Sequence, residues 1–165
     1  MQDTDLAWLA GIWEGEGSIL LYSRPVNDKR IQITPLVTVT NTDVGIVNKA
    51  RKIVEEMGCN FSWREYKPKG KASYLQCYKL SSAHAGNIKI FLEHILPYMV
   101  GAKKAYGETL LAFVSRRVEK AREQNVVLKH LKYDNEDYEF LRSSTTARVT
   151  PKGEDTVSSH DESMS

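Results

Sequence analysis

The chain has 165 residues, of which 41% are hydrophobic and 27% charged, a composition typical of one soluble globular domain with a sizeable core. No apolar run approaches the ~20 residues of a membrane span, and residues 1–5 are acidic, unlike the basic start of a secretory signal peptide. Cys59 and Cys77 lack the spacing of a metal site, which indicates core packing in a reducing, intracellular setting.

The net charge of +2 hides an uneven distribution along the chain. Residues 151–165 contain one lysine and four acids, which leaves 22 basic and 17 acidic residues in the remainder. The positive excess falls on residues 18–40, with a net +2, and residues 61–79, with a net +4. This concentration favours a polyanionic partner, although a basic stretch is also typical of an ordinary solvated face.

The first predicted helix covers residues 6–17, where Ala7, Gly11 and Gly15 recur at every fourth position. That spacing aligns three small residues on one helical face, so a second helix could pack closely against it. The larger apolar residues beside this line are expected to fill the core: Leu6, Leu9 and Trp13. The candidate caps at the start of the helix are Asp3, Thr4 and Asp5, and Gly17 suits its end.

Two acids, Glu14 and Glu16, lie at the C-terminus of this helix, where the helix dipole disfavours a carboxylate by a few tenths to about 1 kcal/mol. If the partner helix is a second copy, such acids meet, and like charges disfavour each other's ionisation. A divalent cation would resolve this conflict, and carboxylate and carbonyl oxygens suit Mg²⁺. The alternative is an amphipathic helix with two surface glutamates.

Strands and a helix follow. Residues 18–22 predict a strand, with a turn around residues 25–28. Residues 31–40 alternate between an apolar and a largely polar face, and Pro35 indicates an edge position or a bulge. A helix capped by Thr42 or Asp43 is expected to run to Met57 and end at Gly58. A second hairpin is predicted from residues 61–66 and 74–80.

Helices are predicted over residues 83–96 and 102–121, then a short helix or strand over 126–131 and a short acidic helix over 134–141. We divide the chain into a core at 1–124, a helical extension at 125–142 and a flexible, polar and acidic tail at 143–165. The element order, α-β-β-α-β-β-α-α, predicts an α+β fold with helices on one side of an antiparallel sheet.

The segment L-A-G-I-W-E-G-E-G, residues 9–17, resembles the signature of the LAGLIDADG homing endonucleases, with departures at Trp13 and Gly15. The element order over residues 6–119 is also similar to that family's αββαββα core, which implies its saddle-shaped antiparallel sheet with helices on one face. The resemblance implies a site-specific double-strand DNA endonuclease, often intron-encoded, that hydrolyses phosphodiesters with Mg²⁺ or another divalent cation such as Mn²⁺.

Because the chain holds one copy of the motif, the resemblance also implies a homodimer that meets through Ala7, Gly11 and Gly15. Two hairpins side by side would cover a pseudo-palindromic target of about 20 base pairs. Neither a membrane nor a small-molecule substrate is expected.

The family's site residues carry over by position. The metal ligand falls on Glu16, and the Gly15 carbonyl would be a second ligand. Asn41 could hold a water network around the nucleophile or simply cap a helix. Lys103 could stabilise transition-state charge, with Lys104 as the neighbouring candidate, or lie on a solvated helix start.

The polar faces of the two hairpins are expected to contact DNA. In the first hairpin the candidates are Tyr22, Arg24, Arg30, Gln32, Thr34, Thr38 and Thr40. In the second they are Arg64, Tyr66, Gln76 and Lys79, although the register of residues 74–80 is ambiguous. Candidate phosphate contacts are Lys67, Lys69, Lys71 and Lys104. The histidines at 84, 94, 130 and 160 show no metal-site spacing, and we assign them no role.

Two other functions fit the same residues. One is a non-cleaving DNA- or RNA-binding protein on the same scaffold, such as an intron maturase or a regulator. The other is a nonspecific nucleic-acid-binding protein, whose affinity would depend steeply on salt. Cleavage of a selected DNA target in Mg²⁺ discriminates between the three.

Overall fold

The computed structural model describes residues 1–27, 30–68, 75–144 and 148–149. In chain order the elements are α1 (Asp3–Glu16), β1 (Gly17–Asn27), β2 (Arg30–Asn41), α2 (Val44–Glu56), β3 (Ser62–Tyr66), β4 (Cys77–Ser82), α3 (Ala85–Ile95), the 3₁₀ turn η1 (Leu96–Tyr98), α4 (Ala102–Glu123), the 3₁₀ turn η2 (Leu128–His130), α5 (Asn135–Ser143) and β5 (Arg148–Val149). This is the α+β fold that the element order predicts. Among these helices, none is long and apolar enough to span a membrane.

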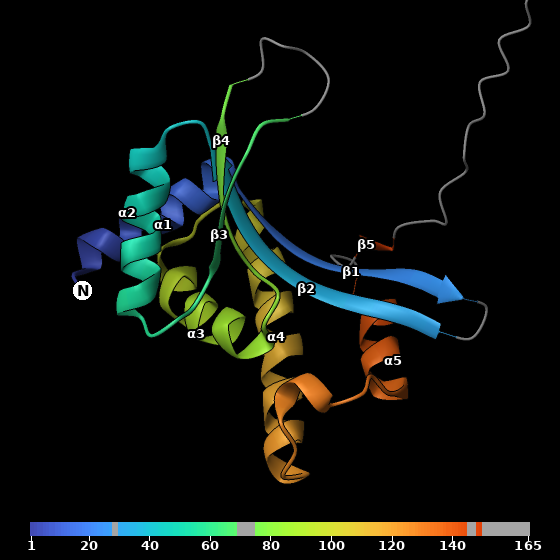
Figure 1. Ribbon diagram of the computed structural model, residues 1–165. Coiled ribbons are helices and arrows are strands. Elements are labelled where there is room, and N and C mark those ends of the chain that lie inside the picture. The colour runs from blue at the N-terminus through green and yellow to red at the C-terminus, as the bar shows by residue number, and fades with distance from the viewer. Residues whose placement is uncertain (28–29, 69–74, 145–147, 150–165) are drawn as a thin grey trace, which may run out of the picture.

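One sheet carries the strands in the order β3-β4-β2-β1-β5. The pairs β1–β2, β2–β4 and β3–β4 are antiparallel, whereas β5 runs parallel to β1. Figure 1 shows α1 to α4 gathered on one side of the sheet, with the β1–β2 hairpin extending beyond them. The predicted turn around residues 25–28 begins too early, because β1 continues through Pro25 and Asn27 pairs with Arg30.

Pro35 lies in the central strand β2, in the part of that strand that has a neighbour on one side only. It faces Leu21 of β1, but β2 pairs with β4 only from Val37 to Asn41. Pro35 therefore lies beyond the end of β4, where a missing N–H breaks no bond to that strand. The edge interpretation of this proline is confirmed.

The core lies between the helices and one face of the sheet. Ile33, Val37 and Val39 are at most 2% exposed, as the alternation in β2 predicts. Trp13 of α1 is fully buried, and its ring centroid lies 4.6 Å from that of Phe91 on α3. Burial of one such large apolar side chain is worth about 1.5–3 kcal/mol, so the predicted apolar side of the motif helix anchors it to the domain.

The helix ends differ in how well the sequence predicts them. Asp43 is the N-cap of α2, as predicted, and accepts hydrogen bonds from Gly45 N at 2.7 Å and Ile46 N at 3.3 Å. The predicted N-terminal caps of α1 are wrong, because the N-cap is Gln2 and the helix starts at Asp3, whereas Gly17 is the C-cap, as predicted. Asp5 still contributes, since its carboxylate accepts from the Gln2 N–H at 3.3 Å.

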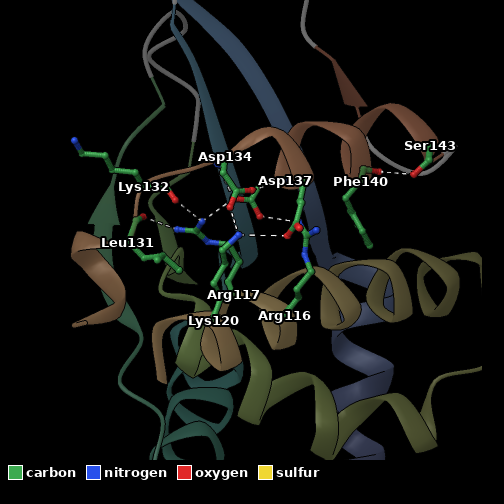
Figure 2. Close-up of polar contacts among 10 residues, drawn as sticks. Arg116, Arg117, Lys120, Leu131, Lys132, Asp134, Asp137, Phe140 and Ser143 are labelled. Carbon is green, nitrogen blue, oxygen red and sulfur yellow. Dashed lines mark hydrogen bonds and ion pairs between the residues drawn. The ribbon is translucent and has the colours of Figure 1, made fainter. Parts of the chain in front are cut away.

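The C-terminal extension docks on α4 through a buried ion pair (Figure 2). Arg117 is 5% exposed and Asp137 is 1% exposed, and their Nη1 and Oδ2 atoms lie 2.8 Å apart. Arg117 also donates to the carbonyls of Leu131 at 2.6 Å and Lys132 at 3.0 Å. The guanidinium therefore joins α4 to both the start of α5 and the segment before it.

The division of the chain into core, extension and tail stays a prediction. Ser143, the first residue of the expected tail, is the last residue of α5, and Arg148–Val149 pairs with β1 at Tyr22 and Ser23. The rest of the expected tail lies outside the described residues.

Candidate nucleic-acid interface and metal site

The face of the sheet opposite the core carries the polar residues of both hairpins. Antiparallel partners project to the same face, so the register defines which side chains share it. Arg24 lies opposite Gln32, and Tyr22 lies opposite Thr34. We call this surface the open face of the sheet.

Most of the predicted DNA contacts share the open face. By strand register, they are Tyr22, Arg24, Gln32, Thr34, Thr38, Thr40, Arg64, Tyr66 and Lys79. Arg24 donates through Nε and Nη2 to Gln32 Oε1, at 3.1 and 3.0 Å. Two side chains predicted to contact DNA are thus held against each other.

The second hairpin resolves the ambiguous register. Leu80 is fully buried, so Lys79 projects to the open face, where it lies between Thr40 of β2 and Arg64 of β3. Gln76 precedes β4 and is therefore not one of the sheet's face residues.

The remaining basic candidates are only partly described. Lys67 is exposed just after β3, and Lys104 is half-buried in the first turn of α4. Arg30 begins β2, but its side chain is outside the description, and Lys69 and Lys71 lie outside the described residues.

The open face contains a pocket that the sequence did not indicate. Its volume is about 380 Å³, and its polar lining joins the two predicted cations to serines, an asparagine and a histidine: Arg64, Lys79, Ser62, Ser81, Ser82, Asn60 and His84. The alternation of Ser62 with Arg64, and of Lys79 with Ser81, could have revealed the serines. His84, for which the sequence indicates no role, caps α3 by accepting from Asn87 N at 3.3 Å.

The motif helix ends beside this face. Glu16 is exposed, and it lines a pocket of about 290 Å³ together with Thr40, Asn41, Thr42 and Cys77. Two predicted site residues, Glu16 and Asn41, are therefore brought together. Asn41 Oδ1 also accepts from Asp43 N at 2.8 Å, so this side chain supports the turn into α2 as well.

Glu14, the other acid of the motif, has a different environment. Its Oε1 accepts hydrogen bonds from Val100 N at 3.0 Å and Gly101 N at 2.7 Å, immediately before α4. The positive end of the α4 dipole favours a carboxylate there. The unfavourable position predicted for Glu14 is thus offset by the fold, which leaves Glu16 as the exposed acid of the pair.

Lys103 makes the reciprocal contact, from α4 to the end of α1. Its Nζ donates to the carbonyls of Trp13 at 3.2 Å, Glu14 at 2.6 Å and Gly17 at 2.7 Å. A cation among the last carbonyls of a helix is favourable for the same electrostatic reason. The sequence alone could not decide whether Lys103 lies on a solvated helix start or beside the motif.

Oxygen ligands for a hard divalent cation are present at the motif end. The Glu16 carboxylate is exposed, and the Gly15 carbonyl is not among the three that Lys103 binds. Both are ligand types that suit Mg²⁺. Among the described residues, no group of three His, Cys, Asp or Glu side chains gathers around a common point.

The small-residue face of α1 is open in the single chain. Ala7, Gly11 and Gly15 are all exposed. A Cβ added at Gly11 or Gly15 would meet nothing within 4 Å. The glycines are therefore not required by packing within the described part of the chain.

No family model matches the chain, and no curated protein matches its sequence. Among solved structures, the chain is similar to the homing endonuclease I-CvuI in complex with its target, with a TM-score of 0.56 and 18% identity, over 89% of this chain and 88% of that one. It is similar to the group I intron-encoded homing endonuclease I-CeuI complexed with DNA, with a TM-score of 0.54 and 14% identity, over 74% and 59%. It is also similar to the LAGLIDADG meganuclease I-AabMI bound to uncleaved DNA, with a TM-score of 0.55 and 15% identity, over 87% and 45%. The chain therefore has the fold of the LAGLIDADG homing endonucleases, which confirms the resemblance seen in its first helix.

Proposed function

We propose that this protein is a metal-dependent, site-specific DNA endonuclease that acts as a homodimer on a long pseudo-palindromic target. The observation that carries the proposal is the position of Glu16. This acid is exposed at the end of the motif helix and shares a pocket with Thr40 and Asn41 at the edge of the open face. A DNA-cutting enzyme needs a metal-binding acid beside a polar and basic surface that can hold DNA.

Glu16 and the Gly15 carbonyl would hold Mg²⁺ or another divalent cation such as Mn²⁺. Bound there, the cation supplies charge neutralisation and an activated water for phosphodiester hydrolysis. Asn41, beside Glu16, would orient water through its amide. The sequence also makes Lys103 a candidate for charge stabilisation.

The open face would position the DNA. Arg24 and Arg64 can each donate two hydrogen bonds to guanine, and Gln32 can pair with adenine in the major groove. Lys67 and Lys104, with Lys69 and Lys71, would contact phosphates, which carry affinity but no sequence information.

Two observations support the homodimer. The face of Ala7, Gly11 and Gly15 is exposed, as a surface awaiting a second helix would be. In addition, 87% of this chain matches only 45% of I-AabMI, as expected if the longer protein contains two such units. A two-fold arrangement would bring one Glu16 to each DNA strand, with about 20 base pairs covered by two hairpins.

The test is selection of a cut site. The protein is incubated with a randomised DNA library in Mg²⁺, and the cut ends are sequenced. We expect one enriched, nearly palindromic site, and a Glu16→Gln variant that binds this site as tightly as the wild type but cuts none of it. Tight, selective binding by the wild type without cleavage would instead support the binding-only alternative.

A further inference from the structure

We infer that Glu14 and Lys103 form a positioning pair that holds the metal-binding end of α1 against α4. The inference rests on the proposed function, because it concerns the same cleavage site. It assigns both residues to the placement of Glu16 and the Gly15 carbonyl, and it removes Lys103 from direct contact with the scissile phosphate.

The pair is reciprocal. The carboxylate of Glu14, from the last turn of α1, accepts the N–H groups of Val100 and Gly101 before α4. The ammonium of Lys103, from the first turn of α4, donates back to carbonyls at the end of α1. Each helix thus supplies the charge that suits the other's terminus. We call this contact the α1–α4 joint.

The donors of Lys103 are fully used. A lysine ammonium has three N–H donors, and this one has three acceptors, the carbonyls of Trp13, Glu14 and Gly17. Contact with a phosphate would require one of these bonds to break. The geometry therefore favours a role in fixing the helix end.

The joint surrounds the proposed metal ligands. The bound carbonyls belong to residues 13, 14 and 17, which flank Gly15 and Glu16 on both sides. Gly101 permits the close approach, because a Cβ at this position would lie 2.9 Å from Glu14 Oε2.

Three variants test the joint: Glu14→Gln, Lys103→Met and the double variant. Each single substitution should loosen the proposed metal ligands, Glu16 and the Gly15 carbonyl. It should therefore raise the Mg²⁺ concentration needed for half-maximal cutting by about 10–100-fold, because loss of the residues that support metal ligands lowers metal affinity by that factor. The affinity for target DNA in Ca²⁺ should stay within about two-fold of wild type. The double variant should need no more Mg²⁺ than the more severely affected single variant, because both substitutions disrupt the same joint.

The matched controls are Glu93→Gln and Lys89→Met, which break a Glu–Lys ion pair on α3 remote in sequence from the motif. They should leave the Mg²⁺ dependence unchanged. A phosphate-contacting Lys103 predicts a different outcome: Lys103→Met would slow cutting equally at all Mg²⁺ concentrations, and its effect would multiply with that of Glu14→Gln. That outcome overturns the inference.

A second readout needs neither metal nor cleavage. Lys103→Met should speed hydrogen exchange of the Val100 and Gly101 amides by at least about ten-fold, because the Glu14 carboxylate that protects them loses its support. Unchanged exchange together with unchanged Mg²⁺ dependence overturns the joint. If the wild type cuts no DNA, both the proposed function and the positioning role are overturned. If the wild type cuts DNA and the variants cut it equally well at all Mg²⁺ concentrations, only the inference is overturned.

Discussion

Helix α4 carries two cations that bind backbone carbonyls, one near each end, and they differ in burial. Lys103 is half-buried, and its three bonds all go to carbonyls of α1 and the start of β1. Arg117 is 5% exposed and is paired with Asp137, which is 1% exposed. The first contact lies beside the proposed metal ligands, and the second holds the C-terminal extension.

Similar hydrogen bonds contribute differently to stability according to how deeply the charged group is buried. Removing one partner of a buried ion pair leaves an uncompensated charge and costs about 3–5 kcal/mol. A cation at a helix C-terminus that water can reach contributes about 0.3–1 kcal/mol. We therefore expect stability to depend on the Arg117 contact and activity to depend on the Lys103 contact.

The largest stability effect is expected for Asp137→Ala. Arg117 would remain buried without its counter-ion, so the free energy of unfolding should fall by about 3–5 kcal/mol in urea titrations. Arg142→Ala is the control, because the Arg142–Glu139 pair is 75% and 67% exposed and should contribute less than about 0.5 kcal/mol. Equal losses in the two variants would contradict the distinction by burial.

A smaller effect is expected where α1 meets β1. A Cβ at Gly17 would lie 2.6 Å from the fully buried Trp13 ring, so Gly17→Ala should destabilise by about 1–3 kcal/mol. Gly11→Ala has open space and should instead stabilise the single chain by about 0.5–1 kcal/mol, because alanine is the better helix former.

Sedimentation experiments should show a second effect of Gly11→Ala, on self-association. A methyl group on the small-residue face would hold two copies apart, so Gly11→Ala should weaken self-association on DNA although it strengthens the monomer. Unchanged association would show that the proposed dimer does not meet at Gly11.

Lys103→Met should have a modest effect on stability, about 1 kcal/mol or less in the same urea titrations. Lys103 itself is only half-buried, so we expect water to replace the ammonium at the carbonyls that it releases. A loss as large as that of Asp137→Ala would show that Lys103 and Arg117 contribute equally to stability despite their different burial.

The smallest effect is a dependence on alkaline pH at the Arg117 contact. Burial raises the pKa of Tyr133 above its ordinary value of 10.0, and the Arg117 guanidinium lies 4.1 Å from the centre of its ring. The neutral phenol is therefore favoured in the folded state, and its contribution is complete below pH 10 and lost as pH rises through the raised pKa. Tyr133→Phe should therefore lose less stability than the wild type above about pH 10. Parallel pH curves for the two proteins would argue against this shift.

The proposed site was only partly readable from the sequence. The signature of residues 9–17 located Glu16, and alternation in β2 selected Gln32, Thr34 and Thr38 for the open face. Gln76 lies just before β4, and Ser62 and Ser81 join the open face. The sequence did not indicate either point, because the pattern of residues 74–80 left the register ambiguous until pairing with β2 and β3 fixed it. The partners of Glu14 and Lys103 gave no sequence signal.

The order of the main helices and strands, the core side of α1 and the two faces of β2 could all be predicted from the sequence, because burial repeats with the period of the local backbone. Tertiary structure alone decided what happens at the helix ends. Lys103 binds carbonyls 86 to 90 residues away, and Arg117 meets an aspartate 20 residues on. Such contacts depend on how helices pack, and no local periodicity records which distant terminus a charged side chain will reach.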